Sequence, residues 1–312
     1  AAAARPVWIL PVIVAVLGAA TSLWFAGNAV LPDLQAAWQL PEAATGPLMA
    51  AVQLGFVAGT LVFAFLSIAD RFAPPSVFFV CAVLAAAANA AIVALASGLW
   101  SLLALRFVTG FFLAGIYPVG MKIAASWYAE GLGRAIGWLV GALVVGTAFP
   151  HLLRGMDATL PWAAVLGVTS LLAVAGGVSI RLAVPAGPHL PGRSPFDPRA
   201  VPRVFRSPDL RAAAFGYFGH MWELYALWVF VPVLVAAWAV RHGAGELNVP
   251  LWSFLIIAAG ALGCIVGGAV SRRTGSALVA FVQLAVSGAA CLLSPLLLAA
   301  PAPVFFASMF AW

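Results

Sequence analysis

Charge is the first thing that this sequence lacks. Only 8% of its 312 residues are Asp, Glu, Lys or Arg, whereas 64% are hydrophobic. A soluble domain carries about 25% charged residues, so this chain has too few of them to cover a surface that faces water. It is rich instead in Trp, Gly and Pro, with 12, 30 and 22 residues. Membrane proteins place Trp at their interfaces and tolerate Gly and Pro within their helices. The composition therefore predicts a protein whose surface faces lipid.

The groups that catalysis and metal binding need are also scarce. The chain has three Cys, all within apolar runs, and four His scattered over different segments. It has no His-Glu-x-x-His zinc pattern, no Gly-x-Ser-x-Gly elbow and no phosphate-binding glycine loop. The net charge of +6 comes from arginines in short gaps between apolar runs, not from a basic patch, which argues against nucleic acid. We therefore expect no enzyme, no metal and no cofactor.

Apolar runs long enough to cross a bilayer recur along the whole chain. A spanning helix needs about 20 apolar residues, and a window of that length finds nine complete runs and the start of a tenth near Pro303. We expect helices near 8–31, 46–69, 76–98, 100–122, 134–153, 162–184, 211–239, 250–270 and 276–299. The first run is too long for the core of a signal peptide. Because the chain begins without Met and stops inside an apolar run, we interpret it as an all-α polytopic protein truncated after about nine and a half helices.

The basic residues predict which side of the membrane each loop faces. With a cytoplasmic N-terminus, twelve basic residues fall inside, only Arg154 and Arg241 fall outside, and Arg106 falls within a span. That is the bias expected when basic residues stay on the cytoplasmic side. We therefore expect a multi-pass protein of the cytoplasmic (inner) membrane with its N-terminus in the cytoplasm. The twelve inside residues are Arg5, Arg71, Lys122, Arg134, Arg181, Arg193, Arg199, Arg203, Arg206, Arg211, Arg272 and Arg273.

A polar segment divides the chain into two parts. Residues 185–210 are rich in Pro and Arg, which oppose a continuous helix and favour the cytoplasmic surface. This linker separates a six-helix half at 1–184 from a second half at 211–312. Asp70-Arg71 ends the second span, and Arg272-Arg273 ends the eighth span 202 positions later. The offset predicts two six-span halves of the same topology.

Small and polar residues predict close contacts between helices. Gly55 and Gly59 form a small-xxx-small step, which lets two helix backbones approach closely. Gly137 and Gly141 form another. Asn89 is predicted to form a hydrogen bond between helices.

Short motifs give the chain a family resemblance. The fourth span carries Arg106-x-x-x-Gly110, and Asp70-Arg71 stands in the loop after the second span. With the span count and the central linker, these motifs resemble the major facilitator superfamily. The segments starting at Tyr117 and Gly219 are similar to a bacterial branch often grouped with nitrate, nitrite or cyanate permeases. The loop after the second span lacks both glycines of the usual motif, and Arg272 replaces the acid after the eighth.

The resemblance implies a mechanism and places for its parts. Members of this family carry solutes by rocking two halves about a central site, and spans one, four, seven and ten line the cavity. The loops at the inner boundary would form a conformational latch, carried here by Asp70, Arg71, Arg272 and Arg273. The plain alternative for these four residues is anchoring of the topology alone.

Ionisable residues inside a bilayer are costly and are candidates for function. His220 and Glu223 are three residues apart on the seventh span, so they project to neighbouring positions. Counted from Arg211 at about 1.5 Å per residue, they lie about 14 and 18 Å deep, near the middle of an apolar core about 30 Å thick. Groups removed from water resist carrying charge, so the pair could bind and release a proton near neutral pH. The alternative is a helix-packing pair.

Arg106 is the candidate for substrate binding, because Arg holds planar anions with two parallel hydrogen bonds. Tyr117 lies eleven residues on, close to three turns of one helix, so we expect both to face the cavity opposite His220 and Glu223. The alternative for Arg106 is a salt bridge or a clamp on backbone carbonyls. Trp24, Asn28 and Tyr225 are further predicted cavity residues, and the alternative for each is packing or anchoring at the membrane interface.

The prediction from the sequence is a secondary active transporter of a small polar solute, a small anion carried with protons. Its expected partners are that solute, protons and lipid. The alternatives are efflux of amphipathic compounds, a membrane solute sensor and a channel.

Overall fold

The computed structural model describes residues 6–128, 131–157, 159–190 and 200–312, and in these ranges every regular element is a helix. Nine helical segments are long and apolar enough to cross a membrane, and Ala302–Ala311 is a shorter apolar helix. The prediction of nine spans and the start of a tenth is confirmed within those ranges. The helices are α1 (Ile9–Thr21), α2 (Leu23–Ala29), α3 (Leu31–Trp38), α4 (Thr45–Phe65), α5 (Ile68–Arg71), α6 (Pro74–Leu95), α7 (Leu99–Leu113), α8 (Tyr117–Ala125), α9 (Leu132–Met156), α10 (Trp162–Ala183), α11 (Ala200–Arg206), α12 (Pro208–Arg241), α13 (Val249–Thr274), α14 (Ser276–Leu297) and α15 (Ala302–Ala311), with a 3-10 turn at Glu42–Ala44.

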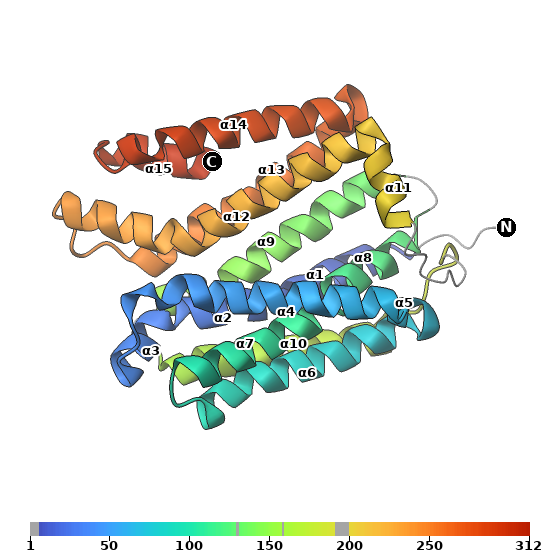
Figure 1. Ribbon diagram of the computed structural model, residues 1–312, viewed down its shortest axis with the longest axis horizontal. Helices are drawn as coiled ribbons and strands as arrows, with labels where there is room; N and C mark the ends of the chain where they lie inside the picture. The colour runs from blue at the N-terminus through green and yellow to red at the C-terminus, as the bar shows by residue number, and fades with distance from the viewer. Residues whose placement is uncertain (1–5, 129–130, 158, 191–199) are drawn as a thin grey trace.

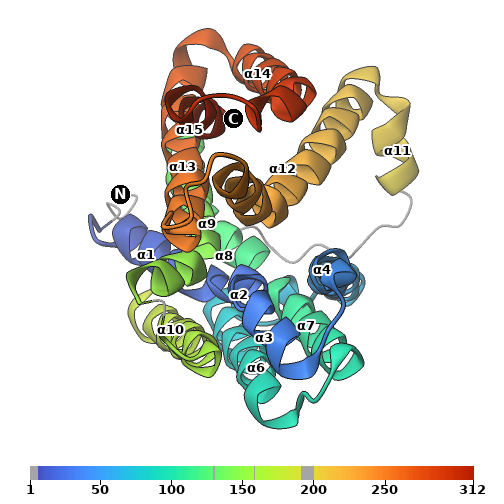
Figure 2. The same cartoon turned by 90° about the vertical axis from the view of Figure 1, so that its left-hand side faces the viewer.

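The long helices run roughly parallel and form two groups (Figures 1 and 2). We call α1–α10 the N-terminal bundle and α12–α15 the C-terminal bundle. Residues 191–199 of the expected linker lie outside the described ranges, and so does Arg5. The rest of the linker includes α11, and α12 begins at Pro208 rather than near 211. Pro fits the first turn of a helix because that turn has no use for its missing N–H.

Two of the expected continuous spans are broken. The first divides at Ser22 into α1 and α2, and the fourth divides at residues 114–116 into α7 and α8. The Ser22 hydroxyl donates to the Ala19 carbonyl at 2.7 Å, a local bond that competes with the regular helix pattern. After the second break, Pro118 lies in the first turn of α8.

Glycines set the closest contacts in the N-terminal bundle. A Cβ on Gly55 would lie 2.0 Å from the Phe107 carbonyl oxygen, and one on Gly59 would lie 2.2 Å from that of Phe111. A Cβ on Gly110 would lie 2.0 Å from the Val52 carbonyl oxygen. The predicted glycine step in α4 is therefore confirmed, and it holds α4 against α7 backbone to backbone.

The two bundles meet mainly along α9 and α13, which lie side by side (Figure 1). A Cβ on Gly137 would lie 2.9 Å from the Cys264 carbonyl oxygen, and one on Gly155 would lie 2.8 Å from the backbone of Leu251. A Cβ on Gly268 of α13 would in turn lie 3.3 Å from the Cα of Gly137. The second predicted glycine step thus faces α13, across the boundary between the bundles.

The loop after α9 is tied down by charge. Arg154 pairs with Asp33 of α3 at 3.0 Å. The carboxylate of Asp157 accepts hydrogen bonds from the Thr159 hydroxyl at 2.6 Å and the Thr159 amide at 2.8 Å. These bonds hold the pKa of Asp157 below its ordinary value. Both contacts fix the turn between α9 and α10.

Candidate functional site

Arg106 is completely buried inside the N-terminal bundle. Its guanidinium donates to the Leu23 carbonyl at 3.0 Å, to the Trp24 carbonyl and to the Asn89 side-chain oxygen at 3.3 Å. Asn89 in turn donates to Ser170 at 3.0 Å. This is the geometry of the carbonyl clamp, and the predicted interhelical bond of Asn89 is confirmed. All three oxygens that Arg106 contacts are neutral.

The expectation that Arg106 and Tyr117 share one face of a helix is wrong. It assumed a continuous fourth span, but α7 ends at Leu113 and α8 starts at Tyr117. Arg106 points toward α2 and α6, where carbonyl and amide oxygens accept hydrogen bonds from its two terminal nitrogens, while its Nε is buried without a partner. Tyr117 is half-buried and lies within electrostatic range of Tyr217 and Cys264 of the C-terminal bundle. A role for either residue in solute binding remains a prediction.

An aromatic cluster joins the two bundles. The ring of Trp24 stacks on Tyr225 of α12 with centroids 5.8 Å apart and lies 4.8 Å from Phe56 of α4. Tyr225 also contacts Trp228 at 5.5 Å, and its hydroxyl bonds with Gln53 of α4. Trp24, Phe56 and Tyr225 form what we call the central aromatic cluster. The structure thus brings together two of the predicted cavity residues, and it adds Phe56, which an apolar run without helical periodicity does not distinguish.

Unpaired polar atoms lie beside this cluster. The indole nitrogen of Trp24 and both polar side-chain atoms of Asn28 are buried without a hydrogen-bond partner. Trp24 and Asn28 are one turn apart on α2, so they share a face. Leaving a buried donor or acceptor unsatisfied costs about 1–3 kcal/mol. The structure therefore leaves two donor groups and one acceptor unpaired at this place.

His220 and Glu223 lie together on α12, as predicted, but they do not face α2. Their Nδ1 and Oε2 atoms are 3.5 Å apart, and the side chains are 41% and 20% exposed. The indole of Trp312 donates to Glu223 Oε1 at 2.9 Å, and Ser287 of α14 also bonds with this carboxylate. Glu223 therefore faces α14 and the end of α15, inside the C-terminal bundle. The expected placement of the pair opposite Arg106 across a cavity is incorrect, because Glu223 is turned toward its own bundle.

The four residues of the expected latch lie near one end of the molecule. Asp70 forms an ion pair with Lys122 of α8, and the same ammonium donates to the Ala69 carbonyl at 2.8 Å. This pair lies within the N-terminal bundle. Arg71 ends α5, and the exposed Arg272 and Arg273 lie in the last turn of α13. Their action as a latch stays a prediction.

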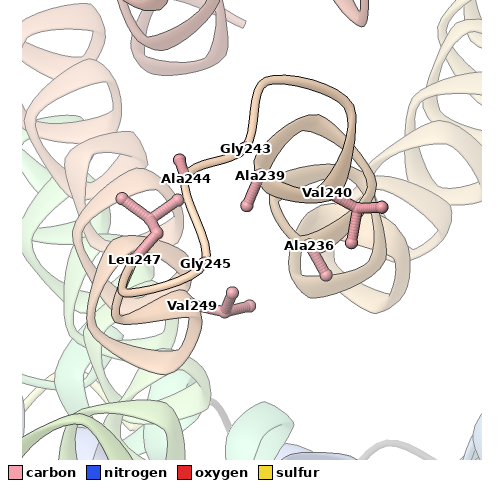
Figure 3. A pocket seen from close by; sticks show the side chains of 8 residues that line it. All are labelled: Ala236, Ala239, Val240, Gly243, Ala244, Gly245, Leu247 and Val249. Atoms are coloured by element: carbon pink, nitrogen blue, oxygen red, sulfur yellow. The ribbon is translucent and has the colours of Figure 1, made fainter.

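A hollow of about 340 Å³ lies under the loop between α12 and α13. Its lining side chains are Ala, Val and Leu, with two glycines (Figure 3). It offers a solute no polar side chain. Among the described residues, no group of three or more His, Cys, Asp or Glu is placed to hold a metal ion.

This arrangement defines a multi-pass membrane protein with two helical bundles that meet along α9 and α13. Residues 12–312 match the model of the Major Facilitator Superfamily, and the chain belongs to that family. No individual curated protein sequence matches it.

Solved structures of transporters share the fold. A bacterial homolog of the human lysosomal transporter Spinster is 17% identical with a TM-score of 0.59, and the match covers 97% of this chain and 72% of that one. The human organic anion transporter MFSD10 is 19% identical with a TM-score of 0.64, covering 98% and 82%. The E. coli xylose transporter XylE is 12% identical with a TM-score of 0.66, covering 97% and 83%. Family and neighbours point to a secondary transporter rather than an enzyme, and they do not support the nitrate-type subgroup.

Proposed function

We propose that this protein carries a small anion together with protons by alternating access. The proposal rests on the two faces of α12, which contact different parts of the molecule. Tyr225 contacts Trp24 of the N-terminal bundle, while Glu223, two residues earlier, faces α14 and α15. A proton site and a contact between the bundles therefore lie on opposite faces of one helix. Movement of that helix would link proton binding to opening of the central aromatic cluster.

The polar atoms beside the cluster support a polar solute. A solute between Trp24 and Asn28 would satisfy a ring N–H, an amide N–H₂ and an amide oxygen that are unpaired in the structure. Arg106 supports negative charge on the solute without contacting it. Its guanidinium lies against the backbone of Trp24 and its hydrogen-bond partners are neutral. In a medium of low dielectric constant, such a charge attracts an anion over several ångströms.

Proton coupling is assigned to Glu223 with His220 beside it. A carboxylate within a spanning helix is costly, which marks it as functional. Both side chains retain some exposure in the structure. Binding a proton at Glu223 removes the negative charge that holds Trp312, which loosens the tie between α12 and α15.

The test uses the protein in liposomes that contain a pH-sensitive dye, with small inorganic anions and small carboxylates added one at a time. We expect one of them to cause acidification inside. Glu223→Gln should abolish that proton entry while leaving exchange of the solute across the membrane. The matched control is Glu246→Gln, because Glu246 is an exposed carboxylate in the loop between α12 and α13. Unchanged proton entry with Glu223→Gln would refute the coupling site. Transport of lipophilic dyes with no response to any anion would favour efflux of amphipathic compounds instead.

A further inference from the structure

An apolar groove of about 430 Å³ opens where α1, α9, α10 and α13 meet. Its walls include Gly18 of α1, Gly141 and Val145 of α9, and Ala261 and Ile265 of α13. The groove lies within membrane-spanning segments, and Val145 is 40% exposed there. The hydroxyl of Ser22, at the edge of the groove, donates its hydrogen bond to the backbone carbonyl of Ala19. The groove therefore offers hydrocarbon to whatever lies in it.

The same helix faces carry positive charge at one end. Arg134 lies one turn before Trp138, which lines the groove, and it continues the row formed by Trp138, Gly141 and Val145. On α13, Arg272 lies two turns beyond Ile265 and continues the row of Ala261 and Ile265.

The two helix ends that carry these arginines are adjacent. A Cβ on Gly268 would lie 3.2 Å from the Gly133 carbonyl oxygen. Arg134 and Arg272 are both exposed. The start of α9 and the end of α13 lie at the end of the molecule where α5 and α11 are found (Figure 1). One opening of an apolar groove is therefore flanked by two guanidinium groups.

We propose that this groove binds an anionic phospholipid, with an acyl chain between α1, α9 and α13 and the phosphate at Arg134 and Arg272. The length fits a single leaflet. Arg134 to Val145 spans about 16 Å at 1.5 Å per residue, close to half of an apolar core about 30 Å thick. Guanidinium groups bind phosphate through charge-assisted hydrogen bonds. The bound lipid would lie against the α9–α13 contact and so touch both bundles.

The test measures lipid retained by the detergent-purified protein in mass spectrometry under non-dissociating conditions. Phosphatidylglycerol and phosphatidylcholine of the same chain length are titrated separately. We expect tighter binding of phosphatidylglycerol. The double substitution Arg134→Gln with Arg272→Gln should weaken it about 30-fold, since each basic residue near anionic lipid contributes about 1 kcal/mol. Arg241→Gln is the matched control, because Arg241 is an exposed arginine in the last turn of α12, at the other end of that helix from α11.

A second pair of variants tests the groove itself. Val145→Trp fills it and should displace phosphatidylglycerol, whereas Leu262→Trp should not, because Leu262 is 67% exposed and does not line the groove. Equal retention of the two lipids would overturn the proposal. So would an effect of Arg241→Gln as large as that of the double substitution, or equal effects of the two Trp substitutions.

Discussion

Particular glycines in the two bundles differ in how closely the facing helix approaches them. In the N-terminal bundle, a Cβ on Gly55 or Gly110 would collide with backbone of the facing helix. Asn89 and Arg106 form a buried polar network behind that contact. In the C-terminal bundle, a Cβ on Gly263 or Gly288 would meet nothing within 4 Å, and among the residues of α14 only Ser287 is buried. Among the described residues, α13 contacts α9 of the N-terminal bundle more extensively than it contacts α12, α14 or α15 of its own bundle.

The largest expected effect comes from removing the guanidinium at the centre of the N-terminal bundle. Arg106→Met should destabilise the protein by about 3 kcal/mol or more, because a hydrogen bond to a charged donor contributes roughly 1.5–3 kcal/mol and three are lost. Arg106→Lys should lie between, since an ammonium cannot reproduce the planar fork. Unfolding in mixed micelles with rising denaturing detergent measures this. Arg241→Met is the exposed control, expected within about 0.5 kcal/mol of the parent. Equal stability of the Arg106 and Arg241 variants would show that the hydrogen bonds of Arg106 do not stabilise the N-terminal bundle.

A smaller effect is expected when a single methyl group is added to one glycine in each bundle. Gly110→Ala should cost about 1–3 kcal/mol, because its Cβ would lie 2.0 Å from the Val52 carbonyl oxygen and force α4 and α7 apart. Gly263→Ala meets open space and should be neutral or stabilising by up to about 1 kcal/mol through helix propensity. The same unfolding assay compares them. If both substitutions changed the free energy of unfolding in the same direction, the close approach of α4 and α7 at Gly110 would not account for the effect.

The smallest effect concerns the ion pair between Asp70 and Lys122. Asp70 and Lys122 are 31% and 21% exposed, so their coupling should be about 1 kcal/mol or less. A double-mutant cycle with Asp70→Asn and Lys122→Met measures it and removes each residue's other effects. A positive coupling places this contact among those that stabilise the N-terminal bundle. No coupling would mean that Asp70 acts through another partner, and the latch would then be sought between the bundles.

The sequence predicts the helices better than it predicts the faces that they present. Span positions follow from the length of apolar runs, and the step of Gly55 and Gly59 correctly indicated a close contact. The sequence does not indicate the breaks at Ser22 and before Tyr117, because apolar residues continue through them. With few polar residues on any helix, no periodicity distinguishes the face toward a partner from the face toward lipid.

The candidate site was harder to predict for the same reason. Two of the three acceptors of Arg106 are backbone carbonyls of α2, 82 and 83 residues away along the chain, and backbone groups leave no signature in a sequence. The spacing of His220 and Glu223 did predict their contact, since it depends on one helix alone. Their turn toward α14 depends on how whole helices pack, which local spacing does not record.

The contact between α9 and α13 has a mechanical consequence. Gly137, Gly155 and Gly268 bring the backbone of α9 close to the backbone of α13 along this line. If one bundle tilts about this line during alternating access, the glycines allow the two helix backbones to stay in contact. A solute or a proton that binds one orientation of the bundles more tightly would then change the populations of the orientations.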